Sequence, residues 1–252
     1  MKLSVVVSVL NSHEIVRRQL LYFSKMGLPD DVEIIYLDDG SDPPLKDTIG
    51  LKNLIIHPTY DYREWTVALA RNMGARIAKG RNILMTDIDF IIPKNVIDIG
   101  REFKGHKRRF KRKFGILDEQ GNFTQSFNAL RSYGLTEERI KRKGTNLPPH
   151  PNHFIMSREV FWDMGGYDEN KMNIPYPKCT DDGAFKARWV EAVNNGKYKD
   201  DDPVSRPYLY MFPSGQFCHD AEDLDFNPFN LFHGLTRKTR ANVYWMRGRR
   251  GK

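Results

Sequence analysis

Two carboxylates follow a short apolar segment of the chain, and their spacing is the first sign of chemistry. Residues 82–86 read as a buried strand, and Asp87 and Asp89 come directly after it. Side chains two residues apart on an extended chain point the same way, so both carboxylates can reach one hard cation or a ribose. In an open α/β sheet, ligands lie beyond the carboxyl ends of the strands, where this pair is expected. The alternative is a solvated Asp-x-Asp turn without a ligand.

The elements that must position this pair alternate between strand and helix. Residues 3–10 form a near-continuous β-branched run typical of a buried strand, and further largely apolar segments that read as strands occur at 33–37, 54–57 and 82–86. Asn11 is a candidate N-cap with Glu14 at the capping-box position, and the helix after it is expected to reach about Phe23. A second helix is expected over 64–79, with Gly80 as its stop. The alternation predicts an α/β fold with a mostly parallel, Rossmann-like central sheet flanked by helices.

The pattern is less regular after Pro93, and residues 115–144 show no period that assigns them to an element. Further elements are expected at 96–103 (helix), 154–156 (strand), 158–164 (helix) and from Thr180 to about Val193 (helix).

Length and composition narrow the class of protein. The 252 residues, 40% of them hydrophobic, are expected to form one large α/β domain. Cys179 and Cys218 do not make a disulfide framework, and no signal peptide or apolar stretch of about 20 residues is visible. These features predict a cytoplasmic protein without a transmembrane segment.

The positive charge is clustered. The net charge is +8, with eight basic residues within 101–113 and seven, without an acid, within 237–252. Such clusters predict a polyanionic partner, either nucleic acid or the anionic lipid of a membrane surface. The alternative is a solvated charged face.

Taken in order, five motifs resemble a known family. They are Asp38-Asp39-Gly40-Ser41, Ala70-Arg71-Asn72-Met73-Gly74, Asp87-Ile88-Asp89, Gly165-Gly166-Tyr167-Asp168-Glu169 and Asp181-Asp182. Their order and spacing resemble the family 2 glycosyltransferases of bacterial and phage type, which are inverting GT-A-fold enzymes that use nucleotide sugars. The resemblance covers residues 3–93 and 152–190, and the stretch between them does not clearly match.

The resemblance implies roles at the donor side. Asp39 accepts from the base of a nucleotide, and Asp38 lies close by. A carboxylate at a strand end suits a uracil-type N–H, so the expected nucleotide is UDP. Arg71 lies near the nucleotide and the acid pair. Asp89 binds the metal and Asp87 lies nearer the ribose, within reach of the same ion. The ion, Mn²⁺ or Mg²⁺, offsets the charge on the diphosphate leaving group.

The resemblance also implies a general base. Asp182 stands where the family has an acidic pair at a helix start, and it takes the proton of the acceptor hydroxyl. Asp181 is the alternative base, or it complements the helix dipole while Asp182 does the chemistry.

The tail resembles the His-Gly-then-basic ending of many bacterial and phage members. It implies His233 as a third metal ligand, with Arg237 and Lys238 among the basic residues that hold the diphosphate. His219 competes with His233 for the metal. His150 and His153 are expected to line the acceptor side instead.

These inferences predict a metal-dependent, inverting hexosyltransferase that moves a sugar from a UDP-linked donor to an acceptor hydroxyl. Its single GT-A domain is expected to comprise a nucleotide-sugar-binding half (1–95), an acceptor-binding half (96–215) and a tail (216–252) that closes the donor site. The acceptor is a glycan or another hydroxyl compound, and an anionic acceptor such as modified DNA fits the basic clusters. One rival, a sugar-nucleotide pyrophosphorylase, needs a glycine-rich loop where residues 8–12 read SVLNS. The other is a non-catalytic nucleic-acid-binding protein, which leaves the ordered acids unexplained.

Overall fold

A computed structural model describes residues 1–61, 66–133, 135, 137–138, 146–147, 149–170 and 181–213 of the chain. Strands and helices alternate through its first part, as the sequence predicts. The elements are β1 (Leu3–Val9), α1 (His13–Met26), β2 (Val32–Asp38), β3 (Leu54–Pro58), α2 (Val67–Ile77) and β4 (Asn82–Asp87). The β-branched runs of β1 and β2 are buried along nearly their whole length, which is typical of strands covered on both faces.

Short strands and helices make up the remainder. They are β5 (Phe90–Ile91), α3 (Lys94–Glu102), β6 (Lys107–Arg109), β7 (Lys111–Phe114), β8 (Ile116–Leu117), β9 (Phe123–Thr124), α4 (Phe127–Ser132), β10 (Asn146–Leu147), β11 (Phe154–Ser157), α6 (Arg158–Asp163), α7 (Asp181–Asn194) and β12 (Tyr208–Met211). The stretch 115–144, which the sequence left unassigned, contributes the β8–β9 pair and α4. The basic run 101–113 enters two strands, β6 and β7, instead of forming a uniformly solvated segment.

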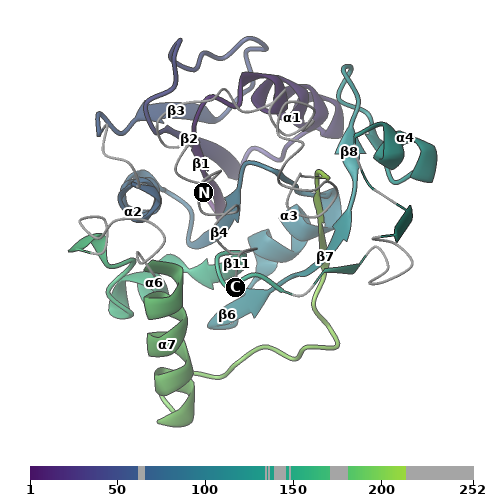
Figure 1. Ribbon diagram of the computed structural model, residues 1–252. Helices are drawn as coiled ribbons and strands as arrows, with labels where there is room; N and C mark the ends of the chain where they lie inside the picture. Colours follow the sequence, from purple (N-terminus) through teal and green to yellow (C-terminus); the bar gives the residue numbers. More distant parts are fainter. Residues whose placement is uncertain are drawn as a thin grey trace, which may run out of the picture.

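The central sheet has six strands in the order β3-β2-β1-β4-β11-β6 (Figure 1). β1 pairs in parallel with β2 and β4, and β2 pairs in parallel with β3. β11 runs antiparallel to both of its neighbours, β4 and β6. The predicted α/β fold with a mostly parallel central sheet is therefore confirmed. A second, four-stranded sheet has the order β10-β7-β12-β5.

Alternate side chains of the central strands face two separate cores. Val5 and Val7 of β1 share one core with apolar residues of α1, α3 and the second sheet. Val6, between them, faces the other core, which contains residues of α2, α6 and α7. In Figure 1, α1 and α3 accordingly lie on one side of the central strands, and α2, α6 and α7 on the other. The strand period of two thus distributes a continuous apolar run over both faces.

The predicted cap of the first helix is wrong. α1 begins at His13, its N-cap is Ser12, and no side chain caps it. Asn11 has a φ of 47°, and its Oδ1 accepts from the backbone N–H of Asp42 at 2.7 Å. Asparagine tolerates this left-handed conformation, so Asn11 ties the end of β1 to the loop after β2 instead of capping the helix. Glu14 forms ion pairs within the helix, with Arg17 and Arg18.

Contrary to the sequence prediction, Gly80 does not end the second helix. α2 ends at Ile77, with Ala78 as its C-cap. A Cβ atom on Gly80 would lie 2.5 Å from the backbone nitrogen of Ser4, and the Gly80 N–H donates to Ser4 Oγ at 2.8 Å. The glycine is required because the chain entering β4 passes directly against the start of β1.

The predictions about cysteines and membrane spans can be compared with the described residues only in part. Cys179 and Cys218 both lie outside them. Within the part of the chain that the structure describes, no helix combines the length and the apolar character needed to cross a bilayer.

We expect Gly80→Ala to lower the free energy of unfolding by about 1–3 kcal/mol, because the added methyl group meets backbone atoms that cannot rotate away. Urea unfolding followed by circular dichroism measures the change. Lys79→Ala is the matched control, since Lys79 is exposed, and it should stay within about 0.5 kcal/mol of the wild type. Equal stability of the two variants would show that the close approach is relieved at no cost.

Candidate active site

The carboxyl ends of three neighbouring strands bring predicted site residues to one edge of the sheet. In the parallel register, Val9 of β1 is opposite Asp38 of β2, and Ser8 is opposite Asp87 of β4. The chain passes from β1 to β2 on one side and reaches β4 on the other. Such a reversal of strand order opens a crevice in which α/β proteins bind ligands.

Asp87 is held between an arginine and a histidine. Nη2 of Arg71 donates to Oδ1 of Asp87, and Nε2 of His153 lies 2.8 Å from Oδ2. The Arg71 side chain, from α2, is only 1% exposed, whereas that of Asp87 is 33% exposed. The buried Arg71 thus holds the carboxylate in place, while part of the carboxylate still faces solvent.

The charges around Asp87 determine the protonation of its neighbours. Burial acts to raise the pKa of Asp87, but Arg71 and then His153 hold it well below its usual range. Burial lowers the pKa of His150 to about 3 and also lowers that of His153, against the opposing charge of Asp87. At neutral pH, Asp87 is therefore ionised and both imidazoles are neutral, so Nε2 of His153 donates its hydrogen to Asp87.

Asp87, His150 and His153 form a group that fits a metal ion. Each offers a ligand atom, and these atoms lie within 4.8 Å of one another. Nδ1 of His153 is buried and has no hydrogen-bond partner among the described residues. Since Nε2 carries the hydrogen, this Nδ1 keeps a lone pair available for a cation. One carboxylate and two neutral imidazoles are a suitable donor set for a divalent transition-metal ion.

The two histidines are the residues that sequence reasoning assigned elsewhere. They were expected at the acceptor side, yet the structure puts both beside Asp87. His153 precedes β11, and β11 pairs antiparallel with β4, with Phe154 opposite Met85. The signal that could have located them is therefore a long-range strand pairing, which no local motif reveals.

Asp89 lies in the turn after Asp87 and is not part of this group of three. Its backbone carbonyl accepts from the N–H of Phe212, just after β12, at 3.0 Å. Burial, and after it the charge of Asp87, raises the pKa of Asp89 to about 7, although a backbone hydrogen bond and Arg112 oppose the rise. Asp89 thus has too little positive charge around it, and a divalent cation is the kind of ligand that corrects such a deficit. Sequence reasoning did not single out Arg112, which is 7% exposed.

Asp38 and Asp39 are both buried at the end of β2. Asp38 accepts backbone N–H groups of Ser41 and Leu45 at 2.9 and 2.8 Å, so it shapes the loop that follows. Asp39 accepts the hydroxyls of Thr59 and Thr66 at 2.9 and 2.6 Å. These contacts orient the Asp39 carboxylate, and the predicted nucleotide contacts of both acids stay predictions.

A buried glutamine supports the turn that carries the acid pair. Nε2 of Gln19, on α1, donates to the carbonyls of Ile88 and Phe90 at 2.6 and 3.0 Å. Its Oε1 accepts from the hydroxyl of Tyr36 at 2.8 Å. Gln19 is 3% exposed, so the turn is fixed from inside the core. A glutamine within an amphipathic helix gives no local sign of this purpose.

The Gly165-Gly166-Tyr167 turn packs against α2. The side-chain oxygen of Asn72 accepts the N–H of Tyr167, and its amide donates to the Tyr167 carbonyl, both at 2.9 Å. A Cβ atom on Gly166 would lie 2.8 Å from Oδ1 of Asn72, so only glycine permits this approach. The ring of Tyr167 lies 5.2 Å from the Arg71 guanidinium. The turn therefore supports the arginine that anchors Asp87.

α7 connects to the site through aromatic stacking. Phe185 stacks on Tyr167 with ring centroids 4.9 Å apart. Asp182, one turn earlier in α7, is half-buried and accepts the backbone N–H of Gly183 at 2.8 Å. The side chain of Asp181 is not described. The acidic start of α7 is thus linked to Asp87 by Phe185, Tyr167 and Arg71, and its predicted catalytic purpose stays a prediction.

The predicted tail residues lie outside the described part of the chain. They are His219, His233, Arg237 and Lys238.

Comparison with known proteins assigns the chain to a family. The sequence profile described as "Glycosyl transferase family 2" matches residues 4–165, which is more than half of the chain and includes Asp39, Arg71 and the acid pair. The chain belongs to glycosyl transferase family 2. The resemblance read from the motifs is confirmed, and the chain is a transferase by family.

Solved structures show the same fold for this family 2 chain. S. aureus TarS 1-349 matches it with a TM-score of 0.53 and 16% identity over 86% of this chain and 61% of that one. TarS 1-349 in complex with UDP matches with a TM-score of 0.51 and 17% identity, over 86% and 62% of the two chains. The family 2 chain therefore spans less than two thirds of either TarS structure. Among curated proteins, no sequence matches it.

For this glycosyltransferase we expect Gln19→Leu to lower the free energy of unfolding by about 2 kcal/mol or more. The change leaves two buried carbonyls and the Tyr36 hydroxyl without their partner, and each such group costs roughly 1–3 kcal/mol. Urea unfolding measures it. The matched control is Gln125→Leu, because Gln125 is exposed and makes a single 3.2 Å bond to the Phe114 carbonyl. A similar midpoint for both variants would contradict the support that Gln19 gives to the turn.

Proposed function

We propose that this family 2 chain transfers a sugar from a UDP-linked donor to an acceptor hydroxyl, with inversion and with a bound divalent metal ion. The observation that carries the proposal is the group of Asp87, His150 and His153 at the carboxyl edge of β4. It lies where the parallel strands of this fold leave a crevice for a ligand. Family membership supplies the reaction class, and the ligand atoms supply the place for the diphosphate's counter-ion.

The donor is proposed to lie across the ends of β1, β2 and β4. Asp39, oriented by Thr59 and Thr66, accepts from the base, and Asp38 maintains the loop around it. UDP is proposed as the nucleotide because a carboxylate at this strand end suits a uracil N–H. The fold shared with TarS, which is also solved with UDP, supports the same choice.

The metal is proposed to be Mn²⁺ or Mg²⁺, held by Asp87 and Asp89 with the imidazoles of His150 and His153. When bound, such an ion offsets the charge that develops on the diphosphate leaving group. Of the two ions, Mn²⁺ suits imidazole nitrogen better, because Mg²⁺ takes oxygen ligands. The raised pKa of Asp89 supports its inclusion, since a neighbouring cation would stabilise its ionised form. Whether His233 adds a ligand stays a prediction from the resemblance.

The acceptor hydroxyl is proposed to lose its proton to Asp182. The start of α7 is connected to the site by the stacking of Phe185 on Tyr167, which supports this choice. A carboxylate positioned on the acceptor side suits direct attack on the sugar carbon and hence inversion. Residues 1–95 are proposed as the donor half and 96–215 as the acceptor half, with the tail from 216 closing the donor site through Arg237 and Lys238.

The rivals are weaker than this proposal. A non-catalytic nucleic-acid-binding protein is contradicted by membership of a transferase family. A nucleic-acid acceptor drew its support from the basic run 101–113, yet several of these cations are engaged within the protein. Arg101 pairs with Asp31, Arg109 pairs with Asp200 and Asp201, and Arg112 is buried.

A donor screen tests the proposal without knowledge of the acceptor. The protein is incubated with UDP-, GDP- and TDP-sugars, with and without Mn²⁺, and the released nucleoside diphosphate is measured. We expect slow release from a UDP-sugar that depends on Mn²⁺. Release that is unchanged by removal of the metal would overturn the metal assignment. A preference for another nucleotide would overturn the choice of UDP.

Asp89→Ala and His150→Ala test the metal ligands separately. We expect each change to weaken Mn²⁺ binding at least about tenfold. Removal of a residue that only orients a metal ligand already lowers metal affinity by that factor, and removal of the ligand itself should lower it no less. Asp89→Ala should also abolish the Mn²⁺-dependent release of nucleoside diphosphate. Calorimetry with Mn²⁺ measures the affinity, and His106→Ala is the control histidine, which contacts Tyr198 away from the acid pair. Wild-type affinity in either variant would remove that residue from the ligand set.

Asp182→Asn separates the base from the donor site. Asparagine has nearly the same shape but does not accept the proton, so donor and metal affinity should stay while transfer falls at least about a hundredfold. Asp181→Asn is the matched comparison and should be milder, because complementing a helix start contributes roughly 0.3–1 kcal/mol. Single-turnover transfer to an acceptor measures both. If Asp181→Asn proves the more damaging while donor binding is intact, the base is Asp181.

A further inference from the structure

A cavity lies beside α7. Its volume is about 210 Å³, and its lining includes Lys107, Arg109, His150, Lys186, Trp189 and Asp200. This volume is below that of pockets for drug-sized ligands, so it suits one small chemical group. His150 also belongs to the group around Asp87, so the cavity adjoins the candidate active site.

Lys107 of β6 is the unusual member of this lining. It is 4% exposed, although lysine is almost never buried without a partner. Its Nζ lies 4.8 Å from the ring centroid of Phe154, 5.0 Å from that of Trp189 and 5.2 Å from that of Phe185. The described residues provide no carboxylate or hydrogen-bond acceptor within bonding distance of this amine. Three aromatic faces attract a cation but accept no hydrogen bond in the way an oxygen atom does.

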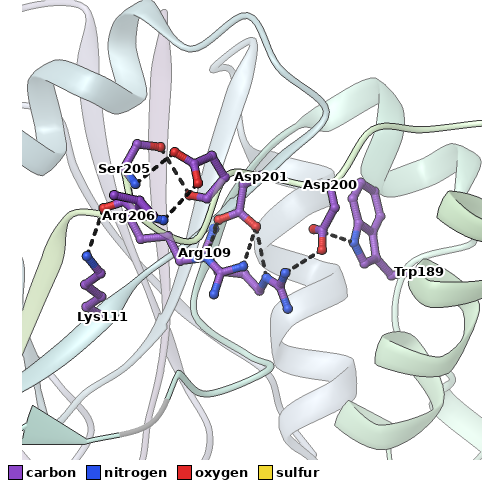
Figure 2. A network of polar contacts seen from close by, with 9 residues as sticks. Arg109, Lys111, Trp189, Asp200, Asp201, Ser205 and Arg206 are labelled. Carbon is purple, nitrogen blue, oxygen red and sulfur yellow. Dashed lines mark hydrogen bonds and ion pairs between the residues drawn. The ribbon is translucent and has the colours of Figure 1, made fainter.

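Asp200 and Asp201, the acids whose charges act on Lys107, already have partners (Figure 2). Asp200 accepts from Nη2 of Arg109 and from Nε1 of Trp189, the latter at 3.2 Å. Asp201 is paired with Arg109 and with Arg206, at 3.1 and 2.6 Å. This network fixes the wall of the cavity without neutralising Lys107.

The electrostatics agree with a missing anion. Burial lowers the pKa of Lys107 to about 7, and Arg109 and Lys186 act in the same direction against Asp200 and Asp201. The ammonium form is costly here because it is desolvated and, among the residues that the structure describes, lacks an oxygen partner. A bound oxyanion would supply that partner and a charge-assisted hydrogen bond.

We propose that this cavity binds an oxyanion group, a phosphate or carboxylate carried by the sugar acceptor, with Lys107 as its central cation and Lys186 at its rim. The assignment to the acceptor rests on the proposed transferase function. The hydroxyl that receives the sugar then lies on the same molecule, toward His150 and the acid pair. The cavity thereby selects acceptors that carry a negative group near the reactive hydroxyl.

Calorimetry with glycerol 3-phosphate, glycerol and inorganic phosphate tests the proposal on the whole protein. We expect glycerol 3-phosphate to bind and glycerol not to bind. Lys107→Met, which keeps an unbranched side chain as far as Cε but removes the amine, should weaken glycerol 3-phosphate binding at least about tenfold, as expected for loss of a charged hydrogen bond. Lys104→Met is the matched control, because Lys104 is an exposed lysine of the same segment, and it should bind as the wild type does.

Other outcomes overturn the proposal. Binding of glycerol 3-phosphate that is equal in Lys107→Met and the wild type rules out the site. Binding of inorganic phosphate without glycerol 3-phosphate shows a closed ion site and rules out the acceptor. If Lys107→Met does not fold, Lys186→Met on the exposed face of α7 replaces it, with a weaker but measurable loss expected. A protein that releases nucleoside diphosphate from a donor but binds no glycerol 3-phosphate overturns this inference alone. One that binds it but acts on no donor overturns the proposed function alone.

Discussion

The contact between Arg71 and Asp87 is the constraint on which the rest of the site depends. Arg71 is almost completely buried, and a buried guanidinium is stable only when its charge is compensated. Asp87 provides that charge from the end of β4, and the ring of Tyr167 covers the guanidinium at 5.2 Å. Removal of either charged partner would take a compensating charge from the other, and the cost is below the roughly 3–5 kcal/mol of a fully buried pair because a third of the Asp87 side chain is exposed. The position of the acid at the strand end is thus tied to the packing of α2.

The same contact joins parts of the chain that are far apart in sequence. Asn72, beside Arg71 on α2, binds both backbone groups of Tyr167, and Phe185 of α7 stacks on that tyrosine. His153 reaches Asp87 from the other side because β11 is inserted between β4 and β6. An antiparallel strand in an otherwise parallel sheet therefore brings the second half of the chain to the carboxyl edge of the first. A ligand at Asp87 meets residues from both halves for this reason.

Much of the first half could be predicted from the sequence because its signals are local. β-branched runs define the strands, and an acid that directly follows such a run must lie at the carboxyl edge, as Asp87 does. The group of ligand atoms around Asp87 could not be predicted in the same way. His150 and His153 follow a proline-rich connector and approach Asp87 only through the pairing of β11 with β4. Gln19 and Arg112 act on the acid pair from α1 and β7, and neither lies in a motif. Asn11 had a plausible local purpose as a cap, but the loop after β2 used its side chain instead.

The basic run 101–113 shows why charge counted along a sequence does not define a surface. Arg109 forms ion pairs with Asp200 and Asp201, which lie about ninety residues later in the chain. These ion pairs hold β6 against the segment before β12. Lys107, two residues away on the same strand, lies on the same face of β6, since residues two apart on a strand point the same way, and both side chains line the cavity. Its amine meets Phe154, Phe185 and Trp189, and the described residues leave no acid to pair with it. One basic run thus contains a cation that stabilises the fold and a cation for which the described residues supply no anion. A ligand that carries a negative charge would complete the second cation, in a cavity next to the candidate active site.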